Sequence, residues 1–331
     1  MRVLLLTERE IKPLLLMSEV MEAVETAFKE KALGYVQMPP KIYITYDRYN
    51  GDLRAMPSYL ERLGVSAVKI VNSHPDNPKK FKLPTVMATI VLVDPKNGAP
   101  LAIMSGTWIT AMRTGAAGGI AAKYLARKDS KVIGLVGAGT QAKTQLMALL
   151  SLYEKLEEVR VWSRSEDRRK EYVSEMEPLC RGKTGILPVE SVKDAVIDAD
   201  IIVTTTPSRK PLVSDEWISE GTHITCIGAD APGKEELDPS ILLRAKIYVD
   251  DWEQGSHSGE INVPLARGMI TKENVYGELG EAVAGFKPRR ISAEEITVFT
   301  STGLAVQDVV TAKLAYEKAL ANDIGEWIEM F

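Results

Sequence analysis

The sequence predicts a two-domain α/β protein that combines a doubly wound parallel sheet with a second, α+β domain. Its length of 331 residues corresponds to about two domains of ordinary size. From Lys131 onward, short apolar strand patterns alternate with helix patterns, which is typical of a parallel sheet covered by helices on both faces. A glycine-rich turn separates the first strand from the first helix of that alternation. We therefore expect the parallel-sheet domain at residues 128–300.

The α+β domain is expected to be discontinuous, joining residues 1–127 to residues 301–331. A final amphipathic helix at 304–320 follows the parallel-sheet segment, and it should pack back on the first half of the chain. Thr7 and Glu10 form a plausible capping box for a first short helix. The other elements expected here are a helix at 18–33 and strands at 41–46, 65–71, 85–93 and 101–104.

A long helix of small residues is predicted at 107–127, and it carries Gly115, Gly118 and Gly119 in its interior. Interior glycines lower helix stability, so they indicate that another backbone or a ligand packs closely there. Beyond it, the parallel domain should contain strands at 131–136, 158–162, 186–189, 201–206, 222–227, 246–250 and 296–299. The helices between them are expected at 140–152, 166–179, 192–198, 215–219 and 235–244.

The glycine-rich turn follows the strand 131–136 directly and opens a helix. Its pattern is GxGxxA, in the strand–turn–helix context that distinguishes a dinucleotide-binding Rossmann turn from an ordinary glycine turn. Gly137 permits the tight turn and Gly139 lets the backbone approach a pyrophosphate, which the helix N-terminus also attracts. We therefore predict cofactor contacts at Gly137, Ala138, Gly139, Thr140 and Gln141.

The second strand of the parallel domain ends in Trp162-Ser163-Arg164-Ser165. An acid normally stands at this strand end and accepts the ribose 2′-hydroxyl of NAD(H). An arginine with flanking hydroxyls suits a 2′-phosphate, so Ser163 and Arg164 favour NADP(H). The alternative is that Arg164 stacks on the adenine and NAD(H) is still accepted.

Two further strand ends lie on the carboxyl edge of the parallel sheet, where ligands of open α/β sheets bind. The fourth strand ends in Thr205-Thr206-Pro207, which adds three predicted cofactor residues. The fifth is followed by Asp230, the carboxylate best placed to meet a nicotinamide. The alternative for Asp230 is a helix cap for the segment after Pro232.

Composition narrows the class of protein. A net charge of −4 gives no sign of a nucleic-acid-binding or membrane surface. The longest uncharged stretch, 97–112, is too short and too interrupted for a membrane span. The two cysteines, Cys180 and Cys226, show no metal-ligand spacing, and no metal site is predicted. We expect a cytoplasmic globular protein.

Four basic residues, Lys41, Arg54, Lys69 and Arg113, fall in the α+β half and could bind a substrate carboxylate. For any one of them alone, a solvated surface charge or an extended side chain that reaches solvent is the more ordinary role. Lys69 and Arg113 are the exceptions, because Lys69 sits mid-strand between apolar neighbours and Arg113 sits mid-helix among small residues. A charge buried in either place needs a partner.

Taken together, these residues resemble the ornithine cyclodeaminase/μ-crystallin family over nearly the full length, most nearly its archaeal-type alanine dehydrogenase branch. The motifs that carry the resemblance are Gln37-Met38-Pro39-Pro40-Lys41, Leu53-Arg54-Ala55-Met56-Pro57, Lys69-Ile70-Val71-Asn72-Ser73-His74-Pro75, Arg113-Thr114-Gly115-Ala116-Ala117, the glycine turn, Gly228-Ala229-Asp230-Ala231-Pro232-Gly233-Lys234 and Ser301-Thr302-Gly303. The resemblance implies a homodimer and a small-molecule 2-amino or 2-oxo acid substrate.

The resemblance also implies roles for individual residues. Lys69 and Arg113 would hold the substrate α-carboxylate, with Lys69 also in a catalytic role, and Asp230 would be the acid/base. Lys41 would face the same site. Thr114 and Ser301 fall in family motifs and join the predicted cofactor contacts.

Two positions bear on the activity that the resemblance implies. Ornithine cyclodeaminases carry a glutamate where this chain has Arg54, and μ-crystallins lack the aspartate at Asp230. The expected activity is NAD(P)-dependent oxidative deamination of a small L-amino acid such as alanine, or its reverse. The alternatives are cyclodeamination, ketimine- or opine-type reduction, and a non-catalytic NADP(H)-dependent ligand carrier.

Overall fold

The computed structural model describes residues 1–180, 182 and 184–330, and the chain divides into two compact units. The first unit comprises Met1–Arg113 and the chain from Leu304 on, and the second is Thr114–Gly303. Both boundaries between the units therefore differ from those expected at 127/128 and 300/301. The first boundary lies inside helix α4 (Thr107–Leu125), because the second half of this helix packs on the second unit.

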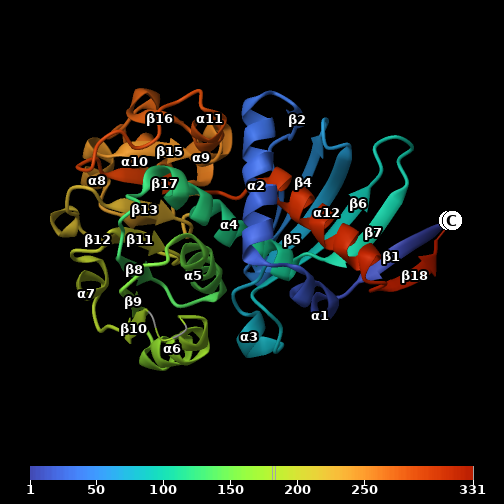
Figure 1. The fold of residues 1–331 in the computed structure, drawn as a ribbon, viewed down its shortest axis with the longest axis horizontal. Helices are drawn as coiled ribbons and strands as arrows, with labels where there is room; N and C mark the ends of the chain where they lie inside the picture. Colours follow the sequence, from blue (N-terminus) through green and yellow to red (C-terminus); the bar gives the residue numbers. More distant parts are fainter. Residues whose placement is uncertain (181, 183, 331) are drawn as a thin grey trace. The chain divides into compact units, whose positions relative to one another are not determined.

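The first unit is built on an eight-stranded sheet within the described residues (Figure 1). Its strand order is β18-β1-β7-β6-β5-β4-β2, and β3 also pairs with β4. The strands are β1 (Arg2–Leu6), β2 (Val36–Gln37), β3 (Ile42–Tyr46), β4 (Gly51–Leu60), β5 (Val65–Ser73), β6 (Val86–Val93), β7 (Pro100–Ser105) and β18 (Glu326–Glu329).

Two long helices pack together in the first unit, α2 (Met17–Ala32) and α12 (Ala305–Ala321). The buried side of α2 follows helical spacing, with Val20, Val24, Ala27 and Phe28 all inaccessible to solvent. Helix α12 also contacts β4, β5 and β6. The prediction that the last helix packs back on the first half of the chain is confirmed. Small helices complete the unit: α1 (Glu8–Ile11), η1 (Lys12–Leu14), η2 (Asp47–Tyr49) and α3 (Asn77–Lys80).

In the first unit, strands β1, β2, β4 and β18 were not predicted from the sequence. Strand β4 is the most consequential, because it carries Arg54, and its Gly51, Asp52 and Pro57 are poor strand formers. Pro57 is tolerated because it lies between the stretches of β4 that pair with β3 and with β2. The predicted capping box is present, since the amide and hydroxyl of Thr7 both donate to the Glu10 carboxylate, at 2.8 and 2.7 Å.

The second unit contains an eight-stranded parallel sheet within the described residues, in the order β10-β9-β8-β11-β13-β17-β15-β16 (Figure 1). The order reverses between β8 and β11, as in a doubly wound fold. The strands are β8 (Val132–Val136), β9 (Glu158–Trp162), β10 (Gly185–Pro188), β11 (Ile201–Thr204), β13 (His223–Cys226), β15 (Lys246–Val249), β16 (Val275–Glu278) and β17 (Thr297–Thr300). A separate two-stranded sheet pairs β12 (Arg209–Val213) with β14 (Glu235–Leu237).

Apolar residues cover both faces of this parallel sheet. Along β11, for example, Ile201 and Val203 belong to one buried cluster and Ile202 belongs to another. Continuous apolar strands of this kind are typical of parallel sheets buried on both sides. The helices and helical turns are α5 (Thr140–Leu152), α6 (Glu166–Cys180), α7 (Val192–Val196), η3 (Asp215–Trp217), α8 (Pro239–Arg244), α9 (Trp252–Ser258), α10 (Asn262–Ala266), η4 (Lys272–Asn274) and α11 (Leu279–Ala284).

The glycines of α4 are explained by a close helix contact. A Cβ on Gly115 would lie 2.5 Å from the carbonyl oxygen of Thr144 on α5, and one on Gly118 would overlap the Gln145 side chain. The prediction that another backbone packs against this helix is confirmed. The predicted helix at 235–244 is wrong in its first part: residues 235–237 form β14, and α8 begins only at Pro239, with Asp238 as its N-cap.

Among the described residues, every helix is too short or too polar to cross a bilayer.

Candidate active site

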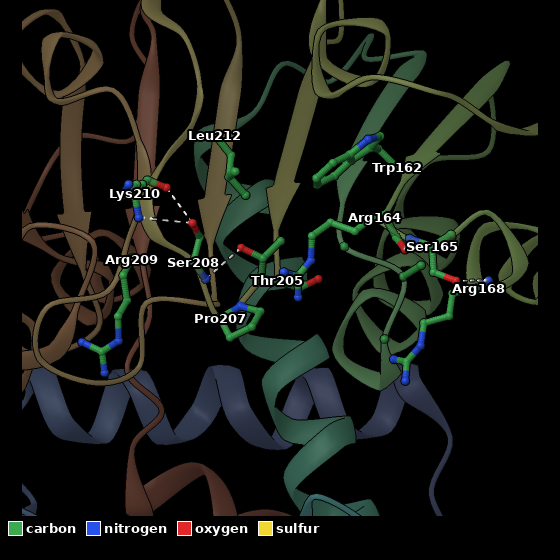
Figure 2. A pocket seen from close by; sticks show the side chains of 15 residues that line it. Trp162, Arg164, Ser165, Arg168, Thr205, Pro207, Ser208, Arg209, Lys210 and Leu212 are labelled. Carbon is green, nitrogen blue, oxygen red and sulfur yellow. Dashed lines mark hydrogen bonds between the residues drawn. The ribbon is translucent and has the colours of Figure 1, made fainter. Parts of the chain in front are cut away.

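A cavity of about 900 Å³ opens at the carboxyl ends of β8, β9 and β11, where the strand order of the parallel sheet reverses. Figure 2 shows Trp162, Arg164, Ser165 and Arg168 on one side, Ser208, Arg209 and Lys210 on the other, and Thr205 and Pro207 between them. The remaining lining residues are Gly137, Ala138, Gly139, Ser163, Thr206 and Leu212. This edge is where open α/β sheets bind their ligands.

The glycine turn has the backbone that a close-fitting loop requires. Gly137 adopts a φ of +122°, and a Cβ there would overlap the Thr205 side chain. Gly139 is the N-cap of α5, and a Cβ there would meet only open space. The unpaired N–H groups of the first turn of α5 are free to bind phosphate oxygens. The turn therefore has the geometry of a pyrophosphate site.

Eight of the twelve predicted cofactor residues line this cavity: Gly137, Ala138, Gly139, Ser163, Arg164, Thr205, Thr206 and Pro207. The other four are not among its lining residues. Thr140 and Gln141 begin helix α5, and the Thr114 carbonyl accepts a hydrogen bond from Gln145 on that helix. The Ser301 hydroxyl donates to Asp250, so it supports a buried carboxylate. Cofactor contacts at these four residues stay predictions.

Three cationic side chains of the cavity wall stand out: Arg164, Arg168 and Lys210. Within the described part of the chain, these three make no side-chain hydrogen bond and no ion pair, while Arg209 donates to the Pro232 carbonyl. Unpaired positive charges gathered around one cavity attract an anionic ligand. Of these three, only Arg164 was predicted from the sequence. Arg168 lies on the surface helix α6, and Lys210 lies on strand β12, which was not predicted.

In the first unit, Lys69 and Arg113 form a buried cluster around Asp308. The Lys69 ammonium lies 2.7 Å from Asp308 Oδ2, and Arg113 Nε donates to Asp308 Oδ1 at 3.0 Å. All three side chains are at most 6% exposed. Arg113 also donates to Gln307 Oε1 at 2.9 Å, and Lys69 donates to the Thr110 hydroxyl at 3.4 Å. The predictions that both cations are buried and need a partner are confirmed.

Burial makes the charge on Lys69 costly. Its pKa is lowered to about 7, first by loss of solvation and then by the Arg113 charge, while Asp308 opposes the shift. The Lys41 charge lowers the pKa of Lys69 further, so Lys41 lies within electrostatic reach. Two cations share one carboxylate here, which leaves the cluster with an excess positive charge whenever Lys69 is protonated.

Arg54 forms an ion pair with Asp52, an acid on its own strand. Its Nε and Nη2 donate to the two oxygens of Asp52, at 3.1 and 2.9 Å, and its guanidinium lies 5.4 Å from the Tyr43 ring centre. Because Asp52 balances the charge of Arg54, Arg54 repels a substrate ammonium less than an unpaired guanidinium would. The register of β4 and β5 still sets Arg54 on the same sheet face as Lys69, because Arg54 is opposite Val71 and Met56 is opposite Lys69.

Asp230 stands in a loop at the carboxyl edge of the second unit, after β13. Its side chain is 36% exposed and its Oδ1 lies 2.5 Å from the Lys234 ammonium. The alternative that Asp230 caps a helix is wrong, because the next element is strand β14. Asn262 holds the loop beyond Asp230, accepting from the Gly233 amide and donating to the Lys234 carbonyl, both at 2.9 Å.

Several residues of these sites escaped sequence analysis, above all Asp308 and Gln307. One signal was available: both are polar residues on the buried face of an otherwise apolar helix, where Ala305, Val306 and Val309 are also buried. In the described part of the chain, no three histidine, cysteine, aspartate or glutamate side chains are grouped to hold a metal ion.

Comparison with known proteins places these features in a family. Residues 1–323 match the profile of the ornithine cyclodeaminase/mu-crystallin family. An alanine dehydrogenase of Archaeoglobus fulgidus is 52% identical over 332 residues, covering 100% of this chain and 99% of the relative. A solved archaeal alanine dehydrogenase dimer with bound NAD has a TM-score of 0.95 at 52% identity, with full coverage of both chains.

A second solved structure is similar to nearly the same degree. It is the Thermococcus litoralis Δ(1)-pyrroline-2-carboxylate reductase in complex with NADH and L-proline. Its TM-score is 0.94 at 44% identity, covering 98% of this chain and 99% of that one.

Proposed function

The chain belongs to the ornithine cyclodeaminase/mu-crystallin family, and on that premise we propose that it is an NADP(H)-dependent amino-acid dehydrogenase. The reaction is L-alanine with NADP⁺ and water giving pyruvate, ammonium, NADPH and a proton, or its reverse. The observation that carries the proposal is the buried pair Lys69 and Arg113 around a single carboxylate. The alanine dehydrogenase name of the relative at 52% identity supports the choice of substrate.

The carboxylate of the substrate is assigned to Lys69 and Arg113. With Lys69 protonated, these residues carry two positive charges against the one negative charge of Asp308, so one further carboxylate balances the cluster. Arg54 and Asp52 already balance each other. Within the Lys69–Arg113–Asp308 cluster, this charge count suits one substrate carboxylate. Lys41, which is within electrostatic reach of Lys69, is assigned to the same substrate site.

The dinucleotide is assigned to the cavity of the second unit, and NADP(H) is preferred because Arg164, Arg168 and Lys210 offer unpaired charges to a 2′-phosphate. When bound, the dinucleotide supplies or accepts the hydride. Asp230 is assigned the proton transfers: it takes a proton from the water that attacks the imine carbon, or returns it during reductive amination. Lys234 stabilises the ionised form of Asp230.

The protein is further proposed to be a homodimer. Ile42, Ile44 and Ile70 lie on the face of the first-unit sheet opposite Arg54 and Lys69, and they are 61%, 51% and 39% exposed. An apolar sheet face of this kind favours association with a second copy. The archaeal alanine dehydrogenase of similar structure is a dimer.

A second candidate is reduction of a cyclic imine. The Thermococcus litoralis relative is a Δ(1)-pyrroline-2-carboxylate reductase at 44% identity, and such a substrate also carries one carboxylate beside its imine. The same cluster of Lys69, Arg113 and Asp308 would hold either substrate, and the cyclic imine, unlike pyruvate, would be reduced without ammonium.

The pH dependence of pyruvate use tests the assignment of Lys69. Because burial lowers its pKa to about 7, the ammonium is present below that pH and lost above it. With saturating ammonium and NADPH, kcat/KM for pyruvate should therefore fall above pH 7, approaching tenfold per pH unit (roughly one proton). In Lys69→Arg the side chain keeps its charge, so the fall should vanish up to about pH 9. A wild-type kcat/KM that is constant from pH 6.5 to 9, or unchanged behaviour in Lys69→Arg, would contradict the assignment.

A further inference from the structure

Glu236 joins the two loops that carry the proposed chemistry of the second unit. Its Oε1 accepts from the Thr206 amide at 2.6 Å, in the loop that lines the cavity after β11. Its Oε2 accepts from the Thr204 hydroxyl at 2.8 Å and from the Gly228 amide at 2.9 Å, two residues before Asp230. Glu236 itself is inaccessible to solvent.

The two loops meet closely at this carboxylate. A Cβ on Gly228 would lie 2.5 Å from the Thr206 amide nitrogen and 2.6 Å from Glu236 Oε2, and it would overlap the Thr206 carbonyl. Only glycine fits, so the backbone leading to Asp230 is in direct contact with the cavity loop. Both oxygens of Glu236 are used as acceptors, which a carboxylate can provide and an amide cannot.

A second buried carboxyl group, that of Glu260, accepts a hydrogen bond from the backbone of Glu236. Glu260 Oε1 accepts from the amides of Glu236 and Leu237, at 2.8 and 2.7 Å, while its Oε2 is buried without a hydrogen-bond partner among the described residues. No described cation forms an ion pair with either group. Two adjacent buried carboxyls without a cation cannot both be ionised at low cost, so one of them holds a proton.

Of the two carboxyl groups, Glu260 is the one that holds the proton. Burial raises its pKa well above the ordinary value, and the Glu236 charge raises it further. Burial also raises the pKa of Glu236, to about 7, but its hydrogen bonds from Thr206, Thr204 and Gly228 favour the ionised form. Protonated Glu260 thus leaves Glu236 as the acceptor that both loops require.

We propose that Glu236 is a positioning residue, which fixes the loop carrying Asp230 against the cofactor loop through Gly228 and Thr206. The inference rests on the proposed acid/base role of Asp230. Glu236→Gln is the informative variant, because one of the two oxygens becomes an NH₂ group. That group would face the backbone N–H of Thr206 or Gly228 and could not accept its hydrogen bond. Glu260→Gln is the matched control, because one amide oxygen can still accept from the amides of Glu236 and Leu237.

Hydrogen exchange of the full-length protein tests the contact without requiring turnover. In Glu236→Gln, peptides containing Thr206 or Gly228 should exchange at least tenfold faster, whereas in Glu260→Gln they should keep wild-type protection. Equal protection of these peptides in the two variants would overturn the proposal. If Glu236→Gln does not fold, Glu236→Asp serves in its place, since it keeps the charge and withdraws the carboxylate by one methylene.

A double-mutant cycle then links Glu236 to Asp230. Glu236→Gln should lower kcat by at least about tenfold in the wild type but by less than about threefold in the Asp230→Asn background, because the group it positions is already inactive. A loss repeated in full in that background would overturn the proposal. Absence of any wild-type turnover would instead count against the proposed function, and the exchange result would still stand.

Discussion

Replacement of Asp230 by asparagine is expected to lower kcat by about 10²–10⁴-fold, the range typical of a lost general acid–base group. The carboxylate is partly exposed and forms an ion pair with Lys234, so substrate and water can reach it. Asparagine has nearly the same shape but cannot take up a proton. Cofactor affinity should change by less than about threefold, because Asp230 is not among the residues that line the cavity.

The measurement combines steady-state kinetics of reductive amination with a titration of NADPH fluorescence. Asp238→Asn is the matched control: it makes the same chemical change on the N-cap of α8, where asparagine caps as well as aspartate. It should retain wild-type kcat. An Asp230→Asn enzyme that keeps more than half of the wild-type kcat would remove Asp230 from the mechanism.

Reversal of the charge at Arg164 is expected to lower NADPH affinity by at least about tenfold and to shift preference toward NADH. Arg164 lines the cavity and has no partner among the described residues, so its guanidinium is available to a 2′-phosphate (Figure 2). In Arg164→Asp the new carboxylate repels that phosphate and instead accepts a ribose 2′-hydroxyl. The effect on NADH should therefore be neutral or favourable.

Dissociation constants for both cofactors, measured at one ionic strength, check this prediction. Lys155→Asp is the control, because it changes the net charge of the chain by the same amount at an exposed position outside the cavity. It should leave the ratio of the two constants unchanged. Wild-type protein that binds NADH tenfold more tightly than NADPH would refute the preference.

Local sequence patterns predicted most strands of the parallel sheet in the second unit, but not β12, β14, β16 or the helices α9, α10 and α11. Helix α5 and strand β9 have the bounds expected from the sequence, and eight predicted cofactor residues line one cavity. These features depend on short-range rules: a strand, a glycine turn and a helix that follow one another within about 30 residues. The same rules indicated that Lys69 and Arg113 are buried.

Partners distant in sequence could not be predicted in the same way. Asp308 is 195 positions from Arg113, and only the folded first unit shows that one carboxylate serves both cations. Glu236 was hidden because its segment was expected to be helical, whereas in strand β14 its side chain reaches Thr206 and Gly228. The Arg54–Asp52 pair was not predicted because strand β4 was not predicted. In a strand, side chains two positions apart lie on the same face, which brings these two together.

We propose that the chain catalyses reductive amination of a small 2-oxo acid, whose carboxylate is bound by the Lys69–Arg113–Asp308 cluster. Initial rates of NADPH oxidation test this, with pyruvate and saturating ammonium compared against Δ(1)-pyrroline-2-carboxylate. Ammonia release in the presence of NADP⁺ compares alanine with ornithine, because conversion of ornithine to proline leaves the cofactor unchanged overall. We expect a kcat/KM for pyruvate at least about tenfold above that for the cyclic imine, and ornithine conversion at least about tenfold below alanine oxidation. Efficient reduction of the cyclic imine with no turnover of pyruvate, or efficient conversion of ornithine to proline, would contradict it.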